Sequence, residues 1–579
     1  MSGDYKAEKE AFVSGMTGSS IGHINMVSLV SLASIALHSA ARTRIPASRF
    51  QFLSEATLLI LPILLSVTLF ADSPGSLCIL LAVPTALLLF LPARESGTYL
   101  PSSLTPSRQS SRSRSSNPSR EPSPSRRDTL VTRIPPLPAL TTYRAHMLLL
   151  TFICILAVDF EVFPRFLAKC ETYGVSLMDI GVGSFVFSQG IVSAIPLVKN
   201  PTHLTAPLLP KVTNVLRKCS PLLLLGLLRT MSVKGTEYPE HVTEYGVHWN
   251  FFVTLAMLPI LQVLLHPLMV YVPISLMGVV VAVSHQLALS SGQLDEFILH
   301  APRESMISAN KEGLISLPGY LAIHLLGLST GTLVLAPSPS YFRRRQQQLR
   351  RRDGDGRPAP DDSETDSDGP SPTSTSFPPR SPASSSSTLS PTSPHASAPS
   401  PPSSSSLRRE NDKTATELCS YAVLWWVLVG ALWLAGTGRG VSRRMANLPY
   451  VVWIAAFNST FLLGYLVLDI AFFPSPMSTS VYSPHSKLKV HPGPDVPRGR
   501  AGRGGDGAGG APSAPPLLEA VNKNGLVLFL LANVTTGLVN LSMQTMYMSD
   551  WAAMMVLTAY SFGIGAVAWT CRHRKLWRF

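Results

Sequence analysis

Residues 143–199 read YRAHMLLLTFICILAVDFEVFPRFLAKCETYGVSLMDIGVGSFVFSQGIVSAIPLVK, and two apolar runs in this stretch flank a short polar segment. Each run is long enough to cross a bilayer as a helix. The ionisable side chains of the polar segment are Asp159, Glu161, Arg165, Lys169 and Glu171. Such groups are costly at a membrane boundary unless they are paired or used, so this segment is the first place to look for function.

Asp159 and Lys169 are the two charges of this segment that chemistry would need. On one continuous helix they would lie roughly 15 Å apart along the axis and on different faces. Pro164 between them argues against such a helix. We therefore expect a turn after Phe163 to bring a carboxylate and an ammonium together at the rim of a membrane cavity. That pair suits a base with its electrostatic partner, and it suits equally a charge pair that only closes a helix hairpin.

The composition is that of a polytopic membrane protein. Of the 579 residues 46% are hydrophobic and only 14% are charged, and the mean hydropathy is positive. The net charge of +14 comes from Arg-rich loops beside apolar spans, which is typical of cytoplasmic membrane loops and not of a nucleic-acid-binding face. The six cysteines are scattered and form no CxxC or His/Cys cluster, so neither a disulfide framework nor a metal site is expected.

The apolar stretches predict an all-α transmembrane bundle of about thirteen spans of about 17–25 residues each. They lie near 24–40, 55–71, 77–93, 144–160, 178–198, 212–228, 250–266, 267–285, 313–336, 418–436, 448–473, 524–543 and 551–570. The sixth is weak because Arg217 and Lys218 interrupt it, and His266–Pro267 is expected to separate the seventh from the eighth.

Three polar insertions divide the chain. The Ser/Arg loop 101–135, the Arg and then Ser/Pro loop 338–412, and the Pro/Gly/Arg loop 475–515 have too few apolar residues to offset the entropy of ordering, so we expect disordered cytoplasmic loops. The expected units are an N-terminal segment with three spans (1–100), a central membrane core with six spans and the lumenal site loops (136–337), two spans (413–474), and two spans with a basic tail (516–579).

The orientation follows from the distribution of Lys and Arg, which favour cytoplasmic loops. With thirteen spans and a cytoplasmic RHRKLWRF tail, the N-terminus is lumenal and every expected cytoplasmic loop is basic. The expected lumenal loops 159–176, 229–248 and 286–312 carry more acids than bases. The loop 437–447, with Arg439, Arg443 and Arg444, is an exception. Asp159 and Lys169 are then expected to face the lumen.

Two further groups of polar residues are candidates for the site. KGTEYPEHVTEYGVHWN (234–250) holds His241 and His248 on an expected lumenal loop. Their spacing is no zinc pattern, so capping and loop hydrogen bonds are favoured over metal binding, although the loop would suit the second wall of a site. Asp179 precedes Gly181, Gly183 and Ser184, whose small size permits close helix approach. Its carboxylate would contact a substrate hydroxyl or pair with a basic neighbour.

Three Asn-x-Ser/Thr sequons, at Asn458, Asn533 and Asn540, fall inside expected spans. N-glycosylation needs a lumenal surface loop. We therefore expect none of the three to be glycosylated, and their amides to bond between helices or to line a polar cavity.

Several motifs carry a family resemblance. VDF (158–160), FPR (163–165), AK (168–169), the E-x-Y-G of 171–174 and SLMDIGVGSFVFSQG (176–190) resemble the signature of the inositol acyltransferases of glycosylphosphatidylinositol (GPI) anchor synthesis, the fungal GPI-anchored wall transfer proteins and their animal counterparts. Supporting blocks are DYKAEKEAFVSGMTGSSIGHIN (4–25), EHVTEYGVHWNFFVTLAMLP (240–259), GLISLPGYLAIHLLG (313–327), RRMANLPYVVW (443–453) and NGLVLFLLANVTTGLVNLSMQT (524–545). The family pattern FPRRFAK reads FPRFLAK here, so one cationic position is missing.

The resemblance implies a reaction. A fatty acyl group, usually palmitoyl, passes from acyl-CoA to the inositol 2-hydroxyl of glucosaminyl-phosphatidylinositol in the endoplasmic reticulum membrane, without a metal or redox cofactor. The alcohol needs a positioned base, and the tetrahedral intermediate needs a cation or a donor. We choose Asp159 as the base and Lys169 for the oxyanion or phosphate. Candidates for substrate binding are Arg165, Asp179, His241 and His248. The sequence has no Gly-x-Ser-x-Gly elbow and no Cys/His pair, so direct transfer is expected.

Two other classes of protein fit the residues taken without the resemblance. A secondary transporter of the endoplasmic reticulum membrane would also have many spans, but transporters usually show paired repeats and interrupted helices near the midplane. A scaffold subunit would leave Asp159 and Lys169 purely structural. The expected partners are acyl-CoA, glucosaminyl-phosphatidylinositol and the bilayer, with no nucleic acid, and no protein partner is indicated.

Overall fold

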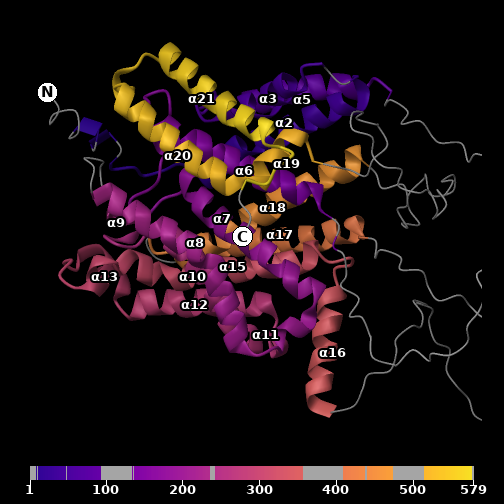
Figure 1. Ribbon diagram of the computed structural model, residues 1–579, viewed down its shortest axis with the longest axis vertical. Coiled ribbons are helices and arrows are strands. Elements are labelled where there is room, and N and C mark those ends of the chain that lie inside the picture. The colour runs from indigo at the N-terminus through magenta and orange to yellow at the C-terminus, as the bar shows by residue number, and fades with distance from the viewer. Residues whose placement is uncertain are drawn as a thin grey trace, which may run out of the picture.

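The computed structural model describes residues 8–9, 11–12, 14–46, 49–92, 134, 136–234, 242–355, 409–436, 440–473 and 514–576, and the regular elements in these ranges are helices (Figure 1). The expected loops 101–135 and 475–515 lie almost wholly outside the described residues, as does most of 338–412. The predicted fold class, an all-α bundle of many membrane spans, is confirmed.

Helices occupy all thirteen expected positions. Nine helices in the described part of the chain are long and apolar enough to cross a membrane: α2 (Ile21–Arg44), α6 (Pro138–Ala157), α7 (Leu177–Lys199), α12 (Ile274–Ser291), α15 (Lys311–Val334), α17 (Asn411–Leu434), α18 (Leu448–Phe472), α20 (Gly525–Ser542) and α21 (Asp550–Thr570). The other four positions hold shorter or more polar helices: α3 with α4 (Gln51–Leu59 and Leu61–Ser66), α5 (Pro74–Leu89), α8 (Leu208–Lys234) and α10 (Phe251–Leu264).

The boundary between the seventh and eighth spans differs from the prediction. It was expected at His266–Pro267, but α11 (His266–Tyr271) follows α10 after a single residue in helical conformation. Pro267 occupies the first turn of α11, where a missing N–H costs nothing. The chain turns instead at Val272, whose backbone is extended before Pro273.

Close packing of α7 on α15 forms the centre of the bundle. A Cβ added at Gly190 would meet the carbonyl oxygen of His324 at 2.2 Å, so the two backbones lie almost in contact. Gly183 plays the expected role of a small residue against Ile454 of α18. Gly181, two residues earlier on α7, has open space where a Cβ would be. The same helix therefore packs tightly along part of its length and borders a cavity near its start.

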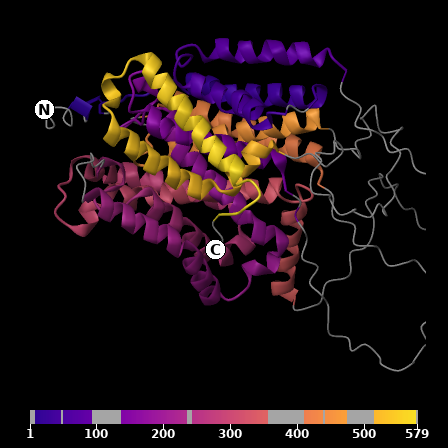
Figure 2. The same cartoon turned by 45° about the horizontal axis from the view of Figure 1, so that its top comes forward.

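The remaining helices surround this centre. α2 and α5 lie side by side at one edge, and α8, α10 and α12 lie at the opposite edge (Figures 1 and 2). α17 packs on α18, and α20 and α21 lie beside α6. The short connecting helices are η1 (Arg165–Leu167), η2 (Pro201–Leu204), α9 (Val242–Tyr245), α13 (Leu294–His300), α14 (Met306–Ala309), α19 (Pro516–Lys523) and η3 (Thr545–Tyr547).

The two ends of the bundle can be told apart by the contacts that fix the helix ends. The turn 158–176 lies at one end, which we call the hairpin end; α9 and α13 mark it at the left of Figure 1. Side-chain caps at Ser20, Ser176, Asn250 and Asn447 begin α2, α7, α10 and α18 there. At the opposite end Arg44 donates to the carbonyl of Leu91, which joins the ends of α2 and α5.

One part of the loop 338–412, expected to be disordered, is a helix. α16 (Tyr341–Asp355) covers the Arg block at the end opposite the hairpin. Phe342 and Leu349 are buried on one side of it, with Gln346 between them. This spacing of three, four and seven residues gives a helical stripe that packs on the protein, so the expectation of disorder is wrong for these residues.

Candidate active site

The turn that follows α6 is organised by Arg165. α6 ends at Ala157, well before Pro164, so the expected interruption of the helix is confirmed. The guanidinium donates to three carbonyl oxygens, those of Val158 (2.9 Å), Phe160 (2.9 Å) and Phe163 (2.7 Å). Burial lowers the pKa of Arg165 to about 10, with Asp159 and Glu161 opposing the shift, so Arg165 is cationic at neutral pH. It holds the turn that presents Asp159.

Asp159 sits in a closed triangle of polar groups. Its side chain is nearly buried, and Lys9 Nζ lies 3.4 Å from Oδ1. Asn540 Nδ2 donates to Oδ2 at 2.8 Å, and Lys9 Nζ also donates to Asn540 Oδ1 at 2.9 Å. The three groups come from the turn after α6, the N-terminal segment and α20, so the orientation of the carboxylate depends on all three.

The described residues between 8 and 20, here called the N-terminal strap, cross the hairpin end. The ring of Phe12 lies 4.1 Å from the guanidinium of Arg165, and Gly15 N donates to Glu171 Oε1 at 2.8 Å. Gly18 forms an isolated parallel bridge with Val175, next to the start of α7. The strap therefore contacts the turn at both ends and carries Lys9 to Asp159.

Lys169 pairs with a different carboxylate from the one expected. Its Nζ lies 2.8 Å from Oε1 of Glu244, at the end of α9. The chain between Asp159 and Lys169 passes through η1, and the partners of the two charges are Lys9 and Glu244. The expected turn forms, but the ion pair across it does not.

A cavity of about 360 Å³ begins at this turn. Lys169, Glu244 and Val158 line it beside the hairpin. On α6 its lining runs from Val158 back to Tyr143, which is about 22 Å at 1.5 Å per residue. Most of the wall is apolar, with Met147, Leu150, Ile155, Leu177, Met178, Ile180, Val182, Phe185, Phe251, Phe457, Phe461 and Phe529. The result is a long apolar space with charged groups at one end.

The far part of the cavity is lined by polar side chains that form hydrogen bonds. The hydroxyl of Tyr143 donates to Asn458 Oδ1 at 2.5 Å, and His146 Nδ1 lies 2.7 Å from the hydroxyl of Tyr465. Asn458 is fully buried and joins α18 to α6, as expected for a sequon inside a span. These pairs link two spans behind the apolar wall.

Both carboxylate oxygens of Asp179 accept hydrogen bonds from other residues of the protein. Its Oδ2 accepts from the Ser176 hydroxyl at 2.8 Å and from the Cys170 amide at 3.1 Å. Its Oδ1 accepts from Nε of Arg443 at 2.7 Å, and Arg443 also lies 3.7 Å from Glu244. Asp179 does not line the cavity. The ion pairs run without a break from Asp179 through Arg443 and Glu244 to Lys169.

Burial of two of its arginines explains why the loop 437–447 is basic although it was expected to be lumenal. Arg443 and Arg444 are both buried, and Arg444 donates to Glu312 at 2.9 Å. Each therefore neutralises a buried carboxylate of a neighbouring span. Arg439 lies outside the described residues.

The two histidines chosen from the sequence are placed differently. His241 lies outside the described residues. His248 is exposed, and its backbone N–H donates to Asn310 Oδ1 at 2.8 Å. Its neighbours Val247 and Trp249 line the cavity, whereas His248 does not. In the part of the chain that the structure describes, no three His, Cys, Asp or Glu side chains are grouped as metal ligands would be.

Sequence reasoning missed Lys9 and Arg443 as members of the site. Both lie in blocks that carry the family resemblance, 4–25 and 443–453, which was the available signal. Phe166, which stands where the family pattern has an arginine, packs on the ring of His23 at 5.2 Å. Lys9 brings a second cation to this end of the bundle from another part of the chain.

Comparisons with known proteins extend over the whole chain. The family model described as GWT1 matches residues 5–571. GPI-anchored wall transfer protein 1 of Cryptococcus neoformans var. neoformans is 36% identical over 678 residues, covering 99% of this chain and 100% of the relative. The protein of the same name from Aspergillus fumigatus is 36% identical over 588 residues, covering 100% of this chain and 99% of the relative. That of Yarrowia lipolytica is 33% identical over 577 residues, covering 97% of both chains.

Proposed function

The chain belongs to the GWT1 family, the acyl-CoA-dependent inositol acyltransferases of GPI-anchor biosynthesis, and on that premise we propose how its residues carry out the transfer. It is a multi-pass membrane enzyme of the endoplasmic reticulum with acyl-CoA and glucosaminyl-phosphatidylinositol as substrates. The donor is palmitoyl-CoA, and the acceptor is the inositol 2-hydroxyl. Membership of this family decides against the transporter alternative.

The cavity beside the hairpin is the site of the acyl chain. The observation that carries this proposal is its shape, an apolar space about 22 Å long on α6 with Lys169 at one end. Apolar walls bind a fatty chain by removing it from water, and few polar groups are needed to fix its end. The thioester would then lie near Lys169, at the level of the turn that carries Asp159.

Asp159 is the general base. Val158, the residue before it, lines the cavity, so the carboxylate belongs to the turn that borders the acyl chain. Lys9 and Asn540 fix its orientation in the free enzyme. The inositol hydroxyl replaces Lys9 at one carboxylate oxygen and gives up its proton as its oxygen attacks the thioester carbon. The C–S bond then breaks, and the sulfur leaves as CoA thiol by taking from Asp159 the proton that the hydroxyl gave up, which restores the carboxylate.

Lys169 stabilises the negative oxygen of the tetrahedral intermediate. A fixed cation near a developing oxyanion is worth more in a site that excludes water than in solution. Glu244 holds the ammonium 2.8 Å away, and Arg443 in turn holds Glu244 from the buried side. Asp179 completes this run of charges, so its role is to position the others and not to bind substrate directly.

Direct transfer agrees with the state of the thiol that follows Lys169 in the sequence. Cys170 follows Lys169 and is buried, and burial together with the nearby Asp179 raises the pKa of its thiol to about 12. A cysteine must be a thiolate to act as a nucleophile. An acyl-enzyme on Cys170 is therefore disfavoured at neutral pH.

Gly181 gives the sharpest test of the acyl site. It lines the cavity, and a side chain there would enter open space. Gly181→Leu would put a side chain into the space that the acyl chain fills, and such overpacking costs about 1–3 kcal/mol. The variant should therefore lower transfer from palmitoyl-CoA by about tenfold or more. Transfer from octanoyl-CoA, which needs less of the cavity, should change by less than about threefold.

The matched control is Gly430→Leu on α17, where an added Cβ also has nothing within 4 Å. Gly430 does not line the cavity, so this variant should keep the chain-length profile of the intact protein. Equal losses with both acyl donors in Gly181→Leu, or no loss with either, would place the acyl chain elsewhere.

A further inference from the structure

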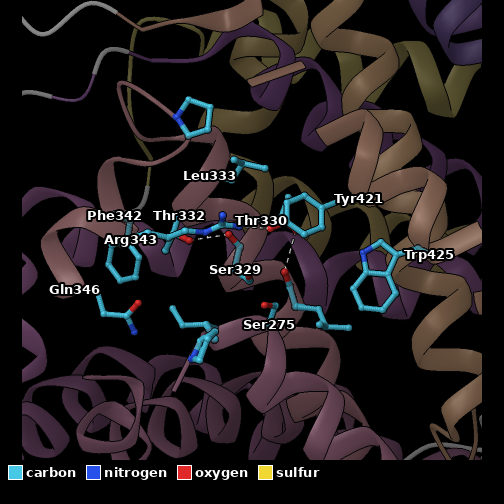
Figure 3. Close-up of a pocket in the computed structure, with 14 residues that line it drawn as sticks. Ser275, Ser329, Thr330, Thr332, Leu333, Phe342, Arg343, Gln346, Tyr421 and Trp425 are labelled. Atoms are coloured by element: carbon cyan, nitrogen blue, oxygen red, sulfur yellow. Dashed lines mark hydrogen bonds between the residues drawn. The ribbon is translucent and has the colours of Figure 1, made fainter. Parts of the chain in front are cut away.

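A second and smaller cavity lies at the end of the bundle opposite the hairpin (Figure 3). Its volume is about 60 Å³, and it is bounded by the start of α12, the end of α15, α16 and α17. The two cavities share no lining residue. Nothing in the proposed acyl transfer uses this second space.

The polar part of its lining is free of acids. Arg343, Gln346, Ser275, Ser329, Thr330 and Tyr421 supply a guanidinium, an amide and hydroxyl groups. Figure 3 shows Arg343 reaching across the cavity to Tyr421, to whose hydroxyl it donates. A space with such donors and no carboxylate suits an anion, and its size suits one phosphate group or a few waters.

The helix that carries Arg343 has a basic outer face. Five of its arginines are exposed: Arg343, Arg344, Arg345, Arg350 and Arg351. The partners of the first three are neutral, namely the Tyr421 hydroxyl, the Ser338 hydroxyl and the Gln348 side-chain oxygen. The opposite face is fixed to the protein, where Gln346 donates to the carbonyl of Met269. The arginines are thus held on a docked helix with their charges uncompensated by these partners.

The position of α16 places this face at the level of lipid headgroups. In Figures 1 and 2 the helix runs across the direction of α15 and α17 at the edge of the bundle. Leu268 and Tyr271 of α11, next to the carbonyls that Gln346 contacts, and Leu276 at the start of α12 are each about half exposed. α12 is a candidate membrane span, and exposed apolar side chains of a spanning helix face hydrocarbon, so we place the phosphate layer beside α16.

We propose that α16 and this cavity bind an anionic phospholipid of the adjacent leaflet, with one headgroup phosphate seated against Arg343 and the remaining arginines facing further headgroups. Exposed basic residues are attracted to an anionic bilayer surface. The docked stripe of Phe342 and Leu349 holds the helix on the protein, so the lipid binds to a preformed surface and no segment has to fold.

The test compares two arginines of the same helix. Full-length protein, depleted of lipid in a neutral detergent, is titrated with phosphatidylserine or phosphatidylcholine, and bound lipids are counted by native mass spectrometry. Arg343→Gln should weaken the tightest phosphatidylserine site by about tenfold, the loss expected for one charged hydrogen bond. Arg345→Gln, on the same helix but outside the cavity, should keep that site. Acyl transfer should be unchanged in both, which shows that they fold.

Three results would overturn the proposal. Equal binding of phosphatidylcholine and phosphatidylserine by the intact protein would mean that charge is not recognised. Equal losses in Arg343→Gln and Arg345→Gln would mean that the cavity holds no phosphate. Displacement of phosphatidylserine by inorganic phosphate or palmitoyl-CoA at comparable concentration would assign the site to a soluble anion.

The acidic tract DDSETDSDG (361–369) of the same chain is the competing occupant. Replacing Asp361, Asp362, Glu364, Asp366 and Asp368 by their amides should leave phosphatidylserine binding unchanged. Binding that appears only in this amide variant would show that the tract covers α16, and would overturn the lipid assignment.

Discussion

Asp159 is held by side chains from two distant parts of the chain, Lys9 and Asn540. Its place at the end of an apolar run marked it as functional, because a carboxylate at a membrane boundary needs a use or a partner. Its partners could not be read from the sequence. Which ammonium reaches which carboxylate depends on how the N-terminal strap and α9 pack, and no local spacing encodes that.

Arg443 is a second residue whose role a single substitution can test. It is buried between Asp179 and Glu244, and removal of one member of a buried pair leaves a charge without compensation. Arg443→Met should destabilise the protein by roughly 3–5 kcal/mol, measured as the loss of folded protein on heating in detergent. The double variant Arg443→Met with Asp179→Asn should recover part of this stability, because the stranded carboxylate is removed.

The pair of Arg444 with Glu312 provides the comparison. Arg444→Met also leaves a buried carboxylate, but Arg303 remains as a second partner of Glu312. Its loss of stability should therefore be smaller than that of Arg443→Met. Equal stability of Arg443→Met and the intact protein would show that the ion pairs of Arg443 with Asp179 and Glu244 do not stabilise the fold.

Among the elements, the N-terminal strap is the one whose contribution can be isolated. Gly18 has a φ of +83°, and an added Cβ would lie 2.4 Å from the carbonyl oxygen of Val175. Gly18→Ala should release the strap, withdraw Lys9 from Asp159 and lower acyl transfer by about tenfold or more. Lys9→Met, which leaves the backbone unchanged, should lower transfer in the same direction.

Gly15→Ala controls for backbone strain alone. Gly15 also has a positive φ, +75°, but nothing lies within 4 Å of an added Cβ. It should keep transfer within about threefold of the intact protein. Matching losses in Gly15→Ala and Gly18→Ala would trace the effect to strain and remove the strap from the site.

The elements differ in how far the sequence predicted them. Long apolar runs predicted the spans, because length and hydropathy alone decide which segments cross a bilayer. Pro267 misplaced one boundary, since proline in a first helical turn does not break the helix. α16 was missed because its composition is polar, and only the stripe of Phe342, Gln346 and Leu349 reveals that it packs on the protein.

At the scale of the whole molecule, we predict that the hairpin end faces the lumen and that α16 faces the cytoplasm. Glu161 and Gln347 are exposed at opposite ends of the bundle. Each is replaced by cysteine in a background where Cys419, an exposed native thiol, is changed to serine. In sealed microsomes with the cytoplasmic side outward, an impermeant maleimide should label Gln347→Cys at once and Glu161→Cys only after detergent. The reverse order would place the hairpin end in the cytoplasm.

The whole fold was predictable only as a class. Composition and thirteen apolar stretches indicate a helical membrane bundle, because water-free surroundings require internally satisfied backbones. The close approach of α7 to α15 at Gly190, and the open space beside Gly181, follow from which helix faces which neighbour. That choice depends on all the spans together, so the cavity could not be located from the sequence.

The most direct test of the site is acyl transfer from labelled palmitoyl-CoA to glucosaminyl-phosphatidylinositol in membranes, at matched expression. Asp159→Asn should lose about 10²–10⁴-fold in rate as a missing general base, and Lys169→Ala about 10²–10³-fold as a missing oxyanion partner. Glu161→Gln, an exposed acid of the same turn, should retain the rate of the intact protein. Full activity in Asp159→Asn and Lys169→Ala would contradict the placement of catalysis at the hairpin.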